Sequence, residues 1–123
     1  MYKRVEGLAA EEFPDIVVFS ESFYGKLRLH ISDGSYVDVW FSRRVPGRYS
    51  YYWKRRHIDG SIYRHDDRPH ACLGDMKTFP KHFHDGSDEN MEESYLSDDP
   101  VDAVRSFLAF ARRKLSDGLI QGK

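Results

Sequence analysis

The chain has 123 residues, of which 40% are hydrophobic and 15% aromatic, and its formal net charge is −1. These numbers predict a single folded domain over residues 1–123, and they exclude both a disordered chain and binding of polyanions through overall charge alone. One cysteine forms no internal disulfide, and neither an apolar run of about 18 residues nor a signal peptide is present, so we expect a cytoplasmic protein without a membrane span.

A short helix is expected first, ending before Pro14. From about residue 15 to residue 66 the pattern changes to the period of two that is typical of β-strands, most clearly in KLRLHIS at 26–32. Three turn signals separate the runs: Asp33-Gly34, Pro46-Gly47 and Asp59-Gly60. The spacing predicts an antiparallel meander of four or five strands.

The rest of the chain is predicted to contain a histidine-rich connection over 65–86, an acidic loop over 85–99 and a helix over about 100–116. Asp99 is placed to cap this helix, and Gly118 to follow its end. The helix carries an apolar stripe made by Val101, Val104, Phe107, Leu108, Ala111 and Leu115. An apolar helix face and an apolar sheet face bury each other, so the predicted fold class is α+β, with the C-terminal helix packed on one face of the sheet.

The other face of the sheet is predicted to mix cations with aromatic rings. If the register holds, it carries Arg28, His30, Tyr36, Asp38, Trp40, Tyr52, Lys54 and Arg56. Rings that stack on bases beside cations that meet phosphates are typical of a nucleic-acid platform. Aromatic residues also favour strands in general, and a homodimer interface has a similar composition, so both alternatives stay open.

Charge is distributed in two blocks. The basic block consists of Arg43, Arg44, Arg48, Lys54, Arg55 and Arg56, and the acidic block of Asp85, Asp88, Glu89, Glu92, Glu93, Asp98 and Asp99. Such blocks are either interaction surfaces or simply solvated faces.

The segment from Arg68 to Gly86 is rich in titratable side chains. It holds three of the six histidines of the chain, His70, His82 and His84. In an extended stretch the side chains of His82 and His84 point the same way, so both could reach one metal ion, with His70 or Asp66 as a third ligand. In a second interpretation the same histidines exchange protons with a phosphodiester without any metal or other cofactor. In a third interpretation the histidines are structural and only form hydrogen bonds with neighbouring backbone groups.

The acid–base interpretation also assigns the surrounding cations. Arg64, Arg68 and Lys81 are candidates to stabilise the negative charge that develops on the phosphate. Asp66 could hold one histidine in a single tautomer. The residues expected to contact nucleic acid are Arg28, Trp40, Tyr52, Lys54, Arg56, Arg64, Arg68 and Lys81.

The motifs YSYYW, RHDDRPH and FPKHFH, with a glycine turn at Asp59-Gly60, resemble the TumE-type toxin family of prokaryotic toxin–antitoxin modules. The resemblance covers about residues 26–115 and is most specific between 49 and 86. It implies a small toxin that a cognate antitoxin neutralises. His65, Asp67, Ala71 and Lys81 depart from the family pattern; the last two stand where the family has histidines.

Together these observations favour a toxin that acts as a metal-independent ribonuclease, with His70, His82, His84 and Asp66 as the catalytic candidates. A non-catalytic protein-interaction or RNA-binding module is the first alternative, in which the acidic loop masks the nucleic-acid site. A hydrolase that binds metal through the three histidines is the second.

Overall fold

The computed structural model describes residues 1–69 and 74–121 and forms an α+β fold, with one antiparallel sheet and two long helices. The elements in chain order are α1 (Tyr2–Glu12), β1 (Val17–Phe23), β2 (Lys26–Ile31), β3 (Tyr36–Phe41), β4 (Tyr49–Arg55), α2 (Arg56–Asp59), β5 (Ser61–Asp66), β6 (His82–Gly86), β7 (Met91–Glu93) and α3 (Pro100–Gln121). Among the described residues, no helix combines the length and apolar character needed to span a membrane.

The sheet is a pure meander, as predicted, because each strand pairs with the strand that follows it in the chain. It has seven strands, so the expected number of four or five was too low. The two additional strands, β6 and β7, lie within the segments predicted to be a connection and an acidic loop. β6 alternates buried His82 and His84 with half-buried neighbours, which is a strand pattern carried by histidines instead of aliphatic residues.

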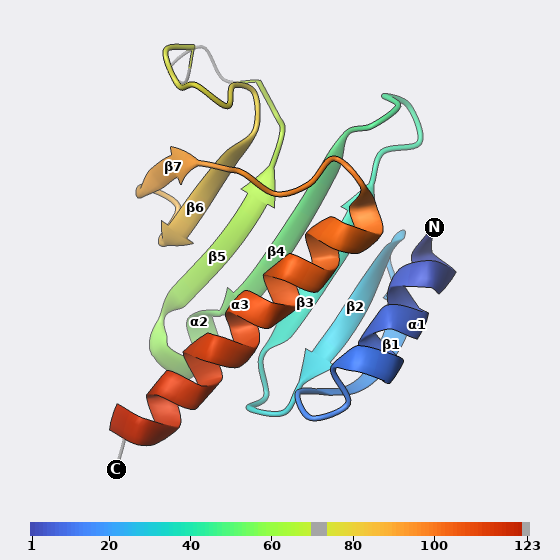
Figure 1. Ribbon diagram of the computed structural model, residues 1–123, viewed down its shortest axis with the longest axis vertical. Coiled ribbons are helices and arrows are strands. Elements are labelled where there is room, and N and C mark those ends of the chain that lie inside the picture. Colours follow the sequence, from blue (N-terminus) through green and yellow to red (C-terminus); the bar gives the residue numbers. More distant parts are fainter. Residues whose placement is uncertain (70–73, 122–123) are drawn as a thin grey trace.

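Two helices cover one face of this sheet (Figure 1). The stripe on α3 is buried as predicted, with Phe107, Leu108 and Val104 almost inaccessible to solvent. It packs over a sheet face that includes Leu29, Val37, Val39, Tyr51 and Trp53. Helix α1 lies beside α3, and Arg105 bonds Glu12 across the two helices.

Helix α3 starts as predicted but ends later. The Asp99 carboxylate accepts a hydrogen bond from the backbone N–H of Asp102, which confirms the predicted N-cap. The helix continues through Gly118 to Gln121 instead of ending near residue 116. Among the described residues, a Cβ at Gly118 would meet nothing within 4 Å, so position 118 is compatible with the interior of a helix.

Within residues 1–69 and 74–121, no helix covers the opposite sheet face, which carries rows of side chains that run across the strands. One row is formed by Arg28, Asp38, Tyr52, Arg64 and His84, each paired with the next in register. The neighbouring row contains Trp40, Ser50, Asp66 and His82. We call this side the open face. The predicted face composition is correct except for Arg56, which starts the one-turn helix α2 and leaves the strand.

Candidate functional site

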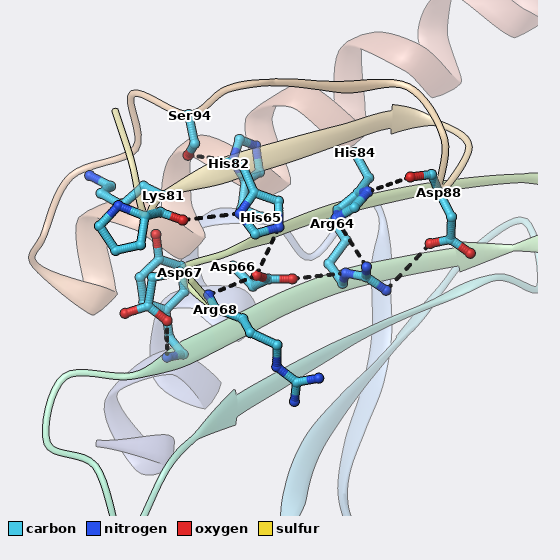
Figure 2. A network of polar contacts seen from close by, with 12 residues as sticks. Arg64, His65, Asp66, Asp67, Arg68, Lys81, His82, His84, Asp88 and Ser94 are labelled. Carbon is cyan, nitrogen blue, oxygen red and sulfur yellow. Dashed lines mark hydrogen bonds and ion pairs between the residues drawn. The ribbon is translucent and has the colours of Figure 1, made fainter. Parts of the chain in front are cut away.

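Asp66 is the centre of a polar network on the open face, at the end of β5 (Figure 2). Its Oδ2 accepts a hydrogen bond from Arg64 Nε at 3.0 Å, and its Oδ1 accepts one from the backbone N–H of Arg68 at 3.0 Å. The same Oδ1 lies 3.0 Å from Nε2 of His82. The antiparallel register places His82 opposite Asp66 and His84 opposite Arg64, so pairing of β5 with β6 assembles the network.

Both histidines of β6 are anchored through Nδ1. In His82, Nδ1 lies 3.0 Å from the carbonyl oxygen of Pro80, and in His84 it lies 2.8 Å from that of Asp88. A carbonyl oxygen only accepts, so Nδ1 carries the proton in each ring. Nε2 of each ring therefore faces the Asp66–Arg64 side of the network.

The two Nε2 atoms have different partners. Nε2 of His84 accepts a hydrogen bond from Arg64 at 3.0 Å, which a neutral ring satisfies. Burial lowers the pKa of His84, and the neighbouring Arg64 charge lowers it further, while the Asp88 carbonyl partly offsets both. Nε2 of His82 instead faces a carboxylate oxygen. The two atoms are 3.0 Å apart, which is within ion-pair distance.

The imidazoles are buried beneath the surface of the open face, with His82 0% and His84 4% exposed. A hollow of about 290 Å³ lies beside them and reaches Asp66 and Arg64. Its lining residues are Trp40, Arg48, Tyr49, Ser50, Tyr52, Arg64, Asp66 and Arg68. We call this hollow the Asp66 pocket. Asp66 and Arg64 are thus the groups that a ligand can touch, and the histidines support them from behind.

The Asp66 pocket is rich in cations. Arg48, Arg64 and Arg68 line it, and Figure 2 shows the Arg68 side chain extending away from the network around Asp66. Arg64 is also held 3.5 Å from Asp88 Oδ1, in the acidic segment. A guanidinium presents a planar fork of donors that matches a phosphate. The Arg64 guanidinium lies 5.0 Å from the centroid of the Tyr52 ring, and Trp40 lines the same pocket.

The same network also contains a set of metal-ligand atoms. Asp66, His82 and His84 each offer one ligand atom, and the three atoms lie within 4.8 Å of one another. Two imidazoles and a carboxylate form a known zinc-ligand set, and both rings already have the carbonyl partners that orient metal-bound histidines. Arg64, however, donates to both Asp66 and His84, so the protein supplies its own cation at this place.

The other predicted nucleic-acid contacts are distributed differently. Arg28 and Lys54 converge on Asp38, which is only 3% exposed, together with Lys26. Arg56 pairs with Asp88 at 2.7 Å. Trp40 and Tyr52 line the Asp66 pocket as expected.

Lys81 makes other contacts than those of the network around Asp66. Lys81 bonds the carbonyl of Leu96 and lies 3.2 Å from Asp98, away from Asp66. His70 lies outside the described residues. Sequence reasoning missed Arg48 and Asp88 as members, although both belong to the charge blocks that it identified.

His65 adjoins the network from the helix-covered face of the sheet. Its ring stacks on Phe83 at 4.2 Å between centroids, and its Nδ1 lies 2.8 Å from the Ser94 hydroxyl. Burial lowers the pKa of His65 to about 3, and the positive charge of Lys81 lowers it further. His65 therefore takes the place of a core aromatic residue and is neutral.

The comparisons with known proteins agree with the resemblance seen in the motifs. No curated protein and no solved structure matches the chain. The family model described as Toxin TumE matches residues 4–115, which includes the whole sheet and most of α3. The chain therefore belongs to the TumE family of toxins.

Proposed function

We propose that this toxin cleaves RNA at the Asp66 pocket and that a cognate antitoxin neutralises it. The observation that carries the proposal is the composition of the pocket, in which one carboxylate and three arginines meet three aromatic rings. Metal-free cleavage of a phosphodiester needs cations that bind the phosphate, rings that stack on a base, and a group that exchanges protons with the reacting oxygens.

The arginines of the pocket recognise the phosphate. Arg64 is fixed by Asp66 and His84, so its guanidinium is oriented before a ligand arrives. Charge that develops on the phosphate is stabilised most by donors that are already in place. Arg48 and Arg68 add positive charge at the rim of the same pocket.

The Asp66–His82 pair is the proton-exchanging group. In this proposal the pair carries one proton between Asp66 Oδ1 and His82 Nε2, which lie 3.0 Å apart, and Asp66 is the member that lines the pocket. In the proposed reaction the ribose 2′-oxygen forms a bond to phosphorus and the bond from phosphorus to the 5′-oxygen breaks. The pair gives its proton to the departing 5′-oxygen, and water takes the proton from the 2′-hydroxyl. The pair then regains a proton from solvent.

In this proposal Asp66 is the catalytic residue and the histidines are positioning residues. His82 shares the proton, and His84 holds Arg64 in place. This differs from the sequence-based hypothesis, in which His82 and His84 contact the substrate themselves, because both rings lie beneath the pocket.

The test compares RNA cleavage and growth inhibition by the wild-type toxin and four variants. Asp66→Asn keeps the size of the side chain but exchanges no proton, so we expect a cleavage rate lower by about 10²-fold or more. His82→Ala is expected to change the pH–rate profile, and His84→Ala to weaken substrate binding through Arg64. His57→Ala is the matched control, because His57 is an exposed histidine of α2 outside the pocket. Wild-type activity in the Asp66→Asn variant would refute the proposal.

A metal-dependent hydrolase is the second candidate, and the Asp66–His82–His84 set of ligand atoms favours it. Titration with Zn²⁺ separates the two. The metal candidate predicts stoichiometric binding that is lost in His82→Ala and cleavage that requires the metal. The metal-free proposal predicts cleavage that a chelator leaves unchanged.

A further inference from the structure

A second hollow of about 340 Å³ lies next to the Asp66 pocket on the open face. It is lined by Phe23, Tyr24, Lys26, Asp38, Trp40, Ser50 and Tyr52. Trp40, Ser50 and Tyr52 line both hollows, so the two form one groove with a shared wall. We call the second hollow the Tyr24 pocket. It brings the turn between β1 and β2 into the same surface as Asp66.

Burial does not account for the aromatic side chain of Tyr24. Its side chain is 91% exposed, and the residue adopts a positive φ of 49° in the turn, followed by Gly25 at 79°. A tight hairpin turn of this kind favours Asn, Asp or Gly at such a position, while a bulky residue there is strained. The backbone strain at Tyr24 is not required by the fold, and its exposed ring lies at the rim of a pocket. Together these features indicate a role in binding.

The Tyr24 pocket combines aromatic faces with positive charge. Phe23 and Tyr24 meet edge to face at 4.7 Å, and the Arg28 guanidinium lies 3.8 Å from the Phe23 ring centroid. Lys54 lies 4.9 Å from the centroid of Tyr52. The Asp38 carboxylate is already surrounded by Lys26, Arg28 and Lys54, so three cations face one acid at this place.

The groove is longer than one nucleotide. Arg64 and Asp66 lie on β5 and Lys26 lies on β2, which is three strands away in the sheet. At about 4.8 Å between neighbouring strands, the distance across the groove is roughly 14 Å. A ligand that fills both pockets therefore extends across the strands.

We propose that the Tyr24 pocket is a base-stacking subsite and that the groove binds single-stranded RNA, with one nucleotide at Asp66 and a neighbouring base against Tyr24 and Trp40. This inference rests on RNA being the substrate of the Asp66 pocket. Unpaired bases can stack on exposed rings, whereas the bases of a duplex are already stacked on each other. The proposal therefore specifies strandedness as well as a second binding site.

The experiment measures binding of a fluorescent 2′-O-methyl RNA oligonucleotide, which cannot be cleaved through its 2′-oxygen, as a single strand and as a duplex. Tyr24→Asn is the decisive variant, because Asn suits the positive φ and preserves the turn while removing the ring. Loss of one stacked base is expected to weaken single-strand binding by about 5- to 150-fold. Tyr24→Phe is expected to restore it, and Tyr95→Ala is the control, because Tyr95 is a tyrosine that is 73% exposed and lies outside the groove.

Failure of this inference can be distinguished from failure of the proposed function. Binding by Tyr24→Asn at the wild-type level, or equal affinity for duplex and single strand, would overturn the subsite whether or not RNA is cleaved. The subsite is supported if Tyr24→Asn loses binding to the single strand while the control variant Tyr95→Ala keeps it. Wild-type cleavage by Asp66→Asn would refute only the proposed reaction and would leave the subsite standing. Absence of single-strand binding by the wild-type protein would overturn the inference itself.

Discussion

Acid should destabilise this protein through His65. The ring is buried among Phe83, Phe107 and Ser94, and burial lowers its pKa to about 3. In the unfolded chain the same imidazole has a pKa of about 6.5. The unfolded state therefore binds a proton first, so stability falls as the pH drops below about 6.5 and continues to fall toward the folded-state pKa.

The size of the effect follows from the pH interval. Between pH 7.5 and pH 5.0, about 1.5 pH units lie below the unfolded-state pKa, which corresponds to a loss of about 2 kcal/mol in the free energy of unfolding. His65→Phe keeps the stacking and removes the titrating group, at the cost of the Ser94 hydrogen bond, about 1 kcal/mol at pH 7.5. His84, whose pKa is also lowered, is present in both proteins and cancels in the comparison.

The assay is urea unfolding of the wild type and of His65→Phe at both pH values. We expect the wild type to lose about 2 kcal/mol more than the variant between pH 7.5 and pH 5.0. His57→Ala should lose as much as the wild type, because His57 is exposed. Equal losses in the wild type and in His65→Phe would refute the assignment of the buried, neutral ring.

Three further predictions concern the open face and the core. Asp38→Asn leaves three cations without their buried carboxylate, so urea unfolding should show a loss of about 3 kcal/mol; a loss below about 0.5 kcal/mol, the range of surface substitutions, would contradict the assigned ion pairs. Asp88→Asn releases Arg56 and Arg64 from a competing carboxylate, so fluorescence anisotropy should show tighter RNA binding with a steeper salt dependence; unchanged affinity would mean that Asp88 does not compete with phosphate. Phe107→Ala opens a cavity between α3 and the sheet, and thermal and urea unfolding should show a loss of about 3–5 kcal/mol, whereas a stable variant would contradict the packing of α3.

The sequence predicts the first five strands and the last helix well because their burial follows simple periods. Apolar and polar residues alternate in 26–31, and the stripe around Val104 and Phe107 repeats with the helical period. Both patterns indicate which side faces the core. Strand β6 was not predicted, because its buried positions are His82 and His84. A period of two formed by polar residues does not indicate a strand with one face in the core.

The candidate site depended on strand pairing that no local pattern contains. Asp66 and His82 are distant in the chain and meet only because β5 pairs with β6 in one register. The spacing of His82 and His84 correctly places both rings on one face, but it does not show that they are buried beneath Arg64 and Asp66. Lys81 was assigned to phosphate because of its neighbours in sequence, while in the structure it contacts Leu96 and Asp98.

Metal-free cleavage through Asp66 is tested with end-labelled RNA, the wild-type protein and Asp66→Asn in the presence of a chelator, with analysis of the product ends. We expect that the wild type still cuts and leaves a 2′,3′-cyclic phosphate and a 5′-hydroxyl, and that Asp66→Asn does not cut. Cleavage that the chelator abolishes, cleavage that survives in Asp66→Asn, or no cleavage by the wild type would contradict this expectation.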